Sequence, residues 1–142
     1  MGDYRKAIEI ARIPEIYCAL SLILDNDIDE ELVINELHKI GIYNATVRKP
    51  KCEPSICVDI AVVRYEHFWD LDSALERMFL QIDSCLDNIR NFAITYNGEI
   101  YIDIAFGHYG TYPSLIFCGD NMKKIRYLEA NISIDPYDYK DD

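Results

Sequence analysis

Hydrophobic and polar residues alternate along several segments of this chain, and a two-residue period is typical of β-strands. The segment from Ile16 to Leu24 is apolar at nearly every position, so it predicts a strand that is apolar on both faces and therefore central in its sheet. The other segments alternate more strictly, as half-buried strands do. In all, the pattern predicts strands at 16–24, 45–49, 56–65, 99–106, 115–117 and 131–135.

Apolar residues at steps of three and four predict helices at 29–40, 72–96 and 119–128. The helix at 72–96 is the strongest of these signals, because its apolar stripe continues from Leu75 to Tyr96, over about six turns. Leu86 lies in the middle of this stripe. We therefore expect Leu86 to be among the most buried residues of the protein.

The ends of two of these helices carry recognisable capping signals. Ser73 and Glu76 have the spacing of a capping box at the start of the long helix. Gly41 follows the first helix, and Asn97 with Gly98 follows the long one, where residues that tolerate a positive φ are favoured. These signals predict sharp helix ends at both places.

The order of the predicted elements is β-α-β-β-α-β-β-α-β, in a chain of 142 residues that fits a single domain, 1–142. Strands and helices in this mixture predict an α+β fold. We expect a mostly antiparallel sheet with one long helix and one or two shorter helices packed on it. The final segment Asp138–Asp142 resembles the start of an engineered epitope tag and is treated as a tail.

The chain is strongly acidic, with a formal net charge of −11. Without the last five residues the charge is still −9, so the acidity does not depend on the tail. An acidic surface repels nucleic acid and anionic membranes, and it attracts a basic protein. We therefore expect no nucleic-acid partner and no membrane partner.

The start of the chain shows no leader-like apolar run, and no segment approaches the roughly 18 apolar residues of a membrane span. An odd number of cysteines without paired spacing is typical of reduced thiols rather than a disulfide framework. We therefore expect a cytoplasmic protein with free cysteines. There are five of them: Cys18, Cys52, Cys57, Cys85 and Cys118.

Several short stretches together resemble an uncharacterised family of small bacterial α/β domains. Trp69–Ser73 resembles its W-x-L-x-S pattern, and Pro113–Leu115 with Ile134–Tyr137 resembles its closing P-x-L and iDiY patterns. Ile28–Leu32 resembles the acidic helix start of that family. The similarity spans about Glu15 to Tyr137. Because some members resemble immunity proteins encoded beside bacterial toxins, the resemblance implies an inhibitor of a toxin, plausibly a nuclease, rather than an enzyme.

Aromatic and acidic residues are grouped as a binding surface for a basic protein would require. The alternative is structural: Tyr65 and Trp69 could staple the long helix to the sheet, and Asp70 and Asp72 could cap it. For Trp69 we favour the stapling role. The candidate partner-binding residues are Asp25, Asp27, Asp29, Glu30, Tyr65, Glu66, Trp69, Asp70 and Asp72.

The acidic run at Asp25 to Asp29, with Glu36, has the spacing of a calcium-binding loop. The required glycine at the sixth position is replaced by Glu30, so the sharp turn is missing and we reject this site. Acids at the start of a helix complement its dipole. We expect no metal, no cofactor and no catalytic residue.

A second functional class remains open. His67 and His108 lie in two predicted loops, and with Glu66 or Asp103 they could support acid–base chemistry or metal binding. This alternative describes a small enzyme or a ligand-binding domain. A pocket beside the two histidines would favour it over the inhibitor.

Overall fold

The computed structural model describes residues 13–25, 27–49 and 54–139. In these ranges a five-stranded mixed sheet is combined with four α-helices in the order β-α-β-β-α-α-β-α-β. The strands are β1 Glu15–Asp25, β2 Thr46–Arg48, β3 Ser55–His67, β4 Glu99–His108 and β5 Asn131–Asp138. The helices are α2 Glu30–Lys39, α3 Leu71–Leu80, α4 Leu86–Thr95 and α5 Gly119–Leu128. The expected α+β class and the mostly antiparallel sheet are confirmed.

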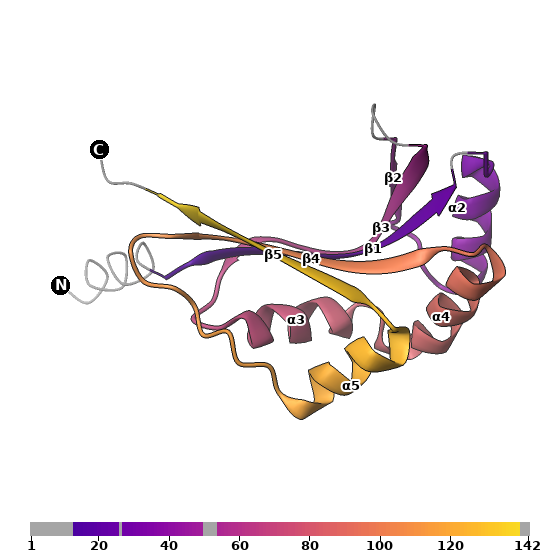
Figure 1. Ribbon diagram of the computed structural model, residues 1–142. Helices are drawn as coiled ribbons and strands as arrows, with labels where there is room; N and C mark the ends of the chain where they lie inside the picture. The colour runs from indigo at the N-terminus through magenta and orange to yellow at the C-terminus, as the bar shows by residue number, and fades with distance from the viewer. Residues whose placement is uncertain (1–12, 26, 50–53, 140–142) are drawn as a thin grey trace.

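The strands are arranged in the order β2-β3-β1-β4-β5 (Figure 1). β1 pairs antiparallel with both β3 and β4, and Leu20 and Leu22 at its middle are fully buried. The predicted central strand is therefore confirmed. β5 pairs parallel with β4 through a connection that contains α5, so the last strand forms one edge of the sheet.

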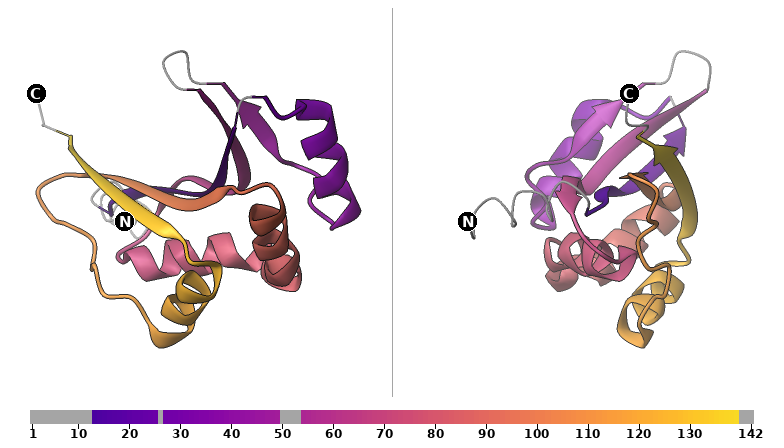
Figure 2. Two further views of the ribbon diagram at one scale, coloured as in Figure 1. Left: turned by 45° about the vertical axis from the view of Figure 1, so that its right-hand side comes forward. Right: turned by 90° about the vertical axis from the view of Figure 1, so that its left-hand side faces the viewer.

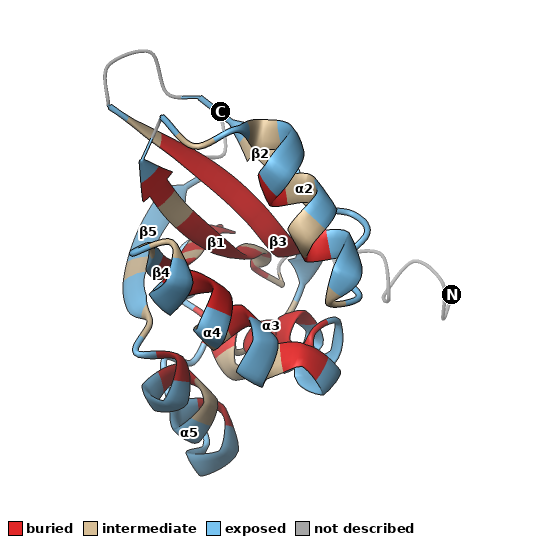
Figure 3. Cartoon of the chain, turned by 90° about the vertical axis from the view of Figure 1, so that its right-hand side faces the viewer, coloured by how far each residue is buried: buried red, intermediate tan, exposed pale blue. Residues whose placement is uncertain are grey.

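The helices α3, α4 and α5 lie on one face of the sheet, while α2 stands where β1 ends and β3 begins (Figures 1 and 2). α3 contacts β1 and β3, and α5 contacts α3 and α4. The inward side of the strands and the facing sides of the helices are buried (Figure 3). The described helices leave the opposite face of the sheet uncovered (Figure 1).

The single long helix predicted at 72–96 is wrong, because the chain forms two shorter helices with a 3₁₀ turn at Asp83–Cys85 between them. Ile82 leaves the helical region with a φ of −133°. Beside the break, the Gln81 amide donates to the Val62 carbonyl oxygen at 2.9 Å and its oxygen accepts from the Val62 N–H at 3.4 Å. Leu86 now begins α4 and is only partly buried, which contradicts our expectation for it.

The predicted strand at 115–117 is also wrong. Leu115 and Ile116 are 50% and 79% exposed. Among the described residues, the β-type pairing near this segment is one isolated bridge between Asp70 and Ser114. A short alternating run on the surface has no neighbouring strand to satisfy its backbone. The described residues therefore form five strands instead of the six expected.

The start of α3 differs from the predicted capping box. The helix begins at Leu71, and its cap is Asp70, whose Oδ1 accepts a hydrogen bond from the Ser73 N–H at 2.6 Å. A carboxylate at this position satisfies a free N–H and also complements the helix dipole. Asp29 caps α2 in the same way by accepting from the Glu31 N–H at 3.0 Å.

The predicted helix ends at Gly41 and at Asn97-Gly98 are confirmed. Gly41 has a φ of 93° and Asn97 a φ of 50°, the left-handed conformation that closes a helix. Gly98 is favoured for a different reason, because a Cβ there would lie 2.5 Å from a methyl group of Leu24. The turn after α4 can therefore pass close to the end of β1.

The last strand is longer than predicted. β5 continues to Asp138, and the Tyr139 N–H donates to the His108 carbonyl oxygen at 2.9 Å. These two residues of the proposed tail are part of the fold, and residues 140–142 lie outside the described ranges. None of the helices in the described part of the chain is long and apolar enough to cross a membrane.

Four cysteines can be compared with the expectation of free thiols. Cys18, Cys57 and Cys85 are buried, Cys118 is exposed, and all four are free, while Cys52 lies outside the described residues. Burial raises the pKa of the Cys18 thiol from its ordinary value of 9.0 to about 12, with Asp103 adding to the shift.

This burial predicts a loss of stability at alkaline pH. The unfolded chain releases the Cys18 proton above about pH 9, whereas the folded chain keeps it until about pH 12, so the free energy of unfolding falls across this window. The contribution of Cys18 at pH 10 is about 1.4 kcal/mol. Urea denaturation at pH 7, 9 and 10 should show a smaller decrease for Cys18→Val than for the wild type. Equal decreases in both proteins would contradict the prediction.

Candidate partner-binding surface

Five of the nine candidate residues lie in or beside the connection between β3 and α3: Tyr65 and Glu66 lie near the end of β3, Trp69 and Asp70 lie in the connection, and Asp72 lies in the first turn of α3. The connection is held against the segment before α5 by two backbone hydrogen bonds: Ser114 N–H to Trp69 oxygen at 2.8 Å, and Leu71 N–H to Ser114 oxygen at 3.0 Å. Asp70 lies in this connection and caps α3, which fixes where the helix begins. Two loops that are distant in the chain therefore form one rigid corner of the molecule.

Asp72 strengthens this corner from the first turn of α3. Its Oδ1 accepts from the Cys118 N–H at 2.9 Å and from the Asn121 amide at 2.8 Å. Burial alone would raise the pKa of Asp72, but the hydrogen bonds from Asn121 and Cys118 outweigh it and hold the pKa below its usual value. Asp72 is therefore a structural anchor for the start of α5, not a carboxylate available to a partner.

The aromatic side chains at this corner are more exposed than expected. Trp69 is 55% exposed, so it does not staple α3 to the sheet in the way we favoured for it, and Tyr65 is 52% exposed. Phe68 takes that place: it packs against the core, and the Arg77 guanidinium lies 5.8 Å from its ring centre. Because Phe68 does the packing, Trp69 is left free to face solvent.

Other large apolar side chains are exposed on the segments that this corner holds together. Leu115 and Ile116 follow Ser114 directly, and Met122, 46% exposed, lies in the first turn of α5. We call Trp69, Leu115, Ile116 and Met122 the Trp69 surface. Asp120, also in the first turn of α5, is exposed too. Large exposed apolar patches with a polar rim typically mark interaction sites, so these residues are candidates for one.

The remaining predicted residues near this corner have partners within the chain. Glu66 forms an ion pair with Arg77 at 3.0 Å, and the Tyr65 ring lies 5.5 Å from the ring of Tyr17. Tyr65 also has a φ of 46°, which is uncommon for a large side chain. These contacts orient both side chains at the end of β3.

The second acidic group lies at the opposite end of the sheet. Asp25 ends β1 and Asp27 follows in the turn, whereas the Trp69 corner adjoins the end of the sheet where β1 begins (Figure 1). The eleven residues of β1 separate the two groups by about 30 Å. In this second group Asp29 caps α2 and Glu30 pairs with Lys49 at 2.8 Å. The structure therefore does not join the two acidic groups into one surface.

The prediction that His67 and His108 lie in loops is wrong, because they are the last residues of β3 and β4. The two residues lie at the same end of the sheet, with β1 between them. Two strand spacings put their backbones about 10 Å apart. The His67 Nδ1 lies 3.0 Å from the Ile13 oxygen, while His108 is buried and its Nδ1 accepts from the Gly110 N–H at 3.2 Å. In the part of the chain that the structure describes, no three His, Cys, Asp or Glu side chains come together as a metal site would require.

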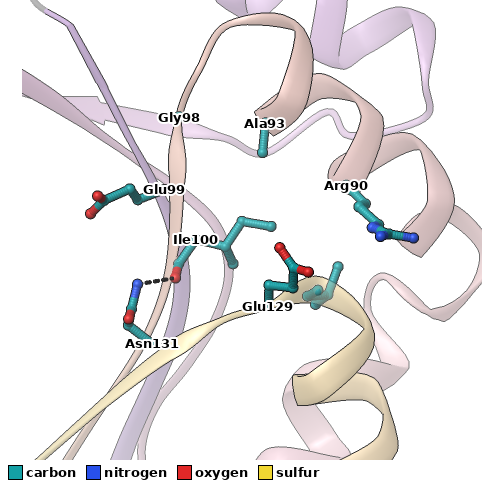
Figure 4. Close-up of a pocket in the computed structure, with 8 residues that line it drawn as sticks. Arg90, Ala93, Gly98, Glu99, Ile100, Glu129 and Asn131 are labelled. Atoms are coloured by element: carbon teal, nitrogen blue, oxygen red, sulfur yellow. Dashed lines mark hydrogen bonds between the residues drawn. The ribbon is translucent and has the colours of Figure 1, made fainter.

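A hollow of about 220 Å³ opens at the other end of β4, where β4 and β5 begin (Figure 4). Arg90, Glu99 and Glu129 line it, and the Asn131 amide donates to the Ile100 carbonyl oxygen at 3.4 Å. Because β4 runs from this hollow to His108, the hollow lies away from both histidines. It therefore does not supply the pocket that the histidine alternative required.

One polar cluster was missed by the sequence reasoning. Asp59 is buried on the uncovered face of the sheet, where its carboxylate accepts from Ser21 Oγ at 2.6 Å. Arg48 binds the same carboxylate with two nitrogens at 2.9 Å, and its Nη2 also lies 3.1 Å from the Cys57 sulfur. An Asp within the apolar run of β3 was the available signal.

The chemistry of this cluster is that of a structural ion pair. The hydrogen bond and charge of Asp59 raise the pKa of Arg48. Burial raises the pKa of the Cys57 thiol, although Arg48 opposes the shift, so the sulfur is not an activated thiolate. The cluster joins the short strand β2 to β3.

Comparisons with protein-family models, with curated proteins and with solved structures gave no match. The geometry of the chain itself therefore carries the functional argument.

Proposed function

We propose that this protein is an immunity protein that binds a basic bacterial toxin domain and blocks it without turnover. A nuclease is the toxin class that fits best, because its substrate surface must be basic to hold a polyanion. The observation that carries the proposal is the Trp69 surface: exposed apolar side chains on a corner held rigid by Asp70 and Asp72, in a chain with a net charge of −11.

Three further features support the proposal. Binding through the Trp69 surface loses little backbone entropy, because hydrogen bonds already fix the backbone at Trp69 and Ser114. A surplus of acids steers a basic partner toward the protein over long distances. The resemblance of the Trp69–Ser73 stretch to a family with immunity-like members implies the same role.

The test co-expresses this protein with the C-terminal domain encoded by the adjacent gene, which the proposal expects to be a toxin. We expect a stable complex in a pull-down and rescue of growth. Trp69→Ala with Ile116→Ala should weaken binding about 30-fold or more, because central aromatic anchors typically contribute 2 kcal/mol or more. Tyr43→Ala is the matched control, since Tyr43 is 70% exposed and lies after α2, away from the corner.

The salt dependence provides a second readout. If the acids steer association, the association rate should fall as ionic strength rises, because exposed charges are screened over about 10 Å at 0.1 M salt. At an ionic strength of about 0.01 M, where the screening length is about 30 Å, Asp25→Lys with Asp27→Lys should slow association and leave dissociation nearly unchanged. Absence of both binding and growth rescue with the wild-type protein would overturn the proposal.

A further inference from the structure

Along the edge strand β5, backbone N–H and C=O groups point alternately toward β4 and away from the sheet. The Tyr139 N–H donates to the His108 carbonyl oxygen, and the Asn131 side chain donates to the Ile100 carbonyl oxygen. Both contacts show that the even-numbered residues of β4 point toward β5. In a parallel ladder the odd-numbered residues of β5 then point back to β4.

It follows that Ile132 and Ile134 direct their N–H and C=O groups to the outside of the sheet, where no described strand pairs with them. Pro136, which lacks an N–H, stands in the same outward register, as expected for an edge strand. The side chains of Ile132 and Ile134 are 37% and 38% exposed. This edge therefore offers both backbone hydrogen bonds and apolar contacts.

The opposite edge of the sheet, formed by β2 and the end of β3, is partly covered. There β2 is only three residues long, and beyond it the Gln81 side chain bonds to both the N–H and the C=O of Val62. That contact occupies the outward backbone groups of β3 at this point. The β5 edge has no such cover among the described residues, so it is the edge open to another strand.

The charges near this edge favour a basic strand as the binding partner. β4 and β5 contain Glu99, Asp103, Asp135 and Asp138 and no Lys or Arg. Pairing β5 with its own copy would bring two acidic strands together, which is unfavourable. A strand with lysine or arginine side chains would instead meet opposite charge.

We propose that the outer edge of β5 accepts an extended strand of a basic protein partner, which adds a sixth strand to the sheet. This inference rests on the proposed function for the identity of the partner and specifies how it docks. Backbone hydrogen bonds to Ile132 and Ile134 supply affinity, while Asp135 and Asp138 favour basic side chains on the added strand.

The experiment uses a fluorescein-labelled peptide of alternating lysine and valine, with a glutamate–valine peptide of equal length as its counterpart. Fluorescence anisotropy should show binding of the lysine peptide only. Ile134→Pro removes one outward N–H without touching the β4 ladder, and should weaken binding at least about tenfold. Ile134→Val, which keeps the N–H, should bind within about twofold of the wild type.

A measurement on the wild-type protein avoids any effect of proline on folding. Amide hydrogen exchange followed by NMR should show the Ile132 and Ile134 amides unprotected alone and protected with the lysine peptide. The Ser133 and Asp135 amides, which face β4, should be protected in both states. Unchanged exchange at Ile134, or full binding by a folded Ile134→Pro variant, would overturn the inference.

Three further outcomes show which part of the proposal is wrong. A concentration-dependent dimer of the wild type that Ile134→Pro abolishes would overturn the basic partner in favour of a second copy. If the toxin domain binds wild type and Ile134→Pro equally, the edge is not its docking site, and the proposed function stands. If the lysine peptide binds but no toxin partner does, the edge inference stands and the proposed function fails.

Discussion

Replacing Phe79 with alanine is expected to lower the free energy of unfolding by about 3–5 kcal/mol. Phe79 lies on α3, is fully buried in the core, and has the Lys124 ammonium 5.4 Å from its ring centre. Removing the ring leaves a cavity that the surrounding strands cannot fill without moving. Chemical denaturation monitored by circular dichroism measures the change.

Leu86→Ala is the comparison that tests the break between α3 and α4. Leu86 is only partly buried, so its removal should cost less than half as much as the removal of Phe79. A continuous helix would instead bury Leu86 and give the two substitutions similar costs. Equal destabilisation would therefore contradict the observed break.

Arg48→Met should destabilise the protein by about 2–4 kcal/mol. The methionine keeps part of the aliphatic chain but leaves the Asp59 carboxylate, only 7% exposed, without its counter-charge. Because the Arg48 side chain is 53% exposed, water reaches the site and the cost should stay below that of a fully buried pair. Thermal and urea denaturation measure it.

A double-mutant cycle isolates the ion pair. Adding Asp59→Asn to Arg48→Met should restore part of the lost stability, because the unpaired charge is removed. Lys49→Met is the neighbouring control: it breaks an exposed pair with Glu30 and should cost less than about 1 kcal/mol. Additive effects of the Arg48 and Asp59 substitutions would show that the two residues are not coupled.

The elements with strong local patterns could be predicted from the sequence. The apolar run of β1 and the alternation in β3 and β4 were sufficient, because burial of one or both faces fixes which side chains alternate. Gly41 and Asn97 marked helix ends correctly, since a left-handed residue closes a helix whatever lies around it. Interactions between residues close in the sequence are sufficient to determine these features.

The errors arose where a distant contact decides the structure. The apolar stripe continues through Ile82 and Cys85, so its period does not reveal that the helix breaks there. Leu115 and Ile116 have a strand-like composition, but no strand lies beside them in the fold. Neither the bonds of Gln81 to β3 nor the path of this loop is visible in a local pattern.

In the candidate site, too, the local sequence pattern identified the segment, whereas contacts with distant residues determine what each side chain does. The residues at Trp69–Ser73 were singled out as a group, but the contacts that each of them makes required the structure. Asp72 was expected on the surface and instead holds the start of α5, while Trp69 was expected to pack and instead faces solvent. Asp59 was missed because its partners Ser21 and Arg48 come from two other strands.

The position of β1 in the sheet has a consequence for how the protein is made. β1 is the first described strand to leave the ribosome, yet it is the central one, and its two neighbours β3 and β4 follow much later in the chain. Until β4 is synthesised, an apolar strand remains without one of its partners and exposes surface that can aggregate. Because these pairings are all distant in sequence, refolding should be slow for a domain of this size.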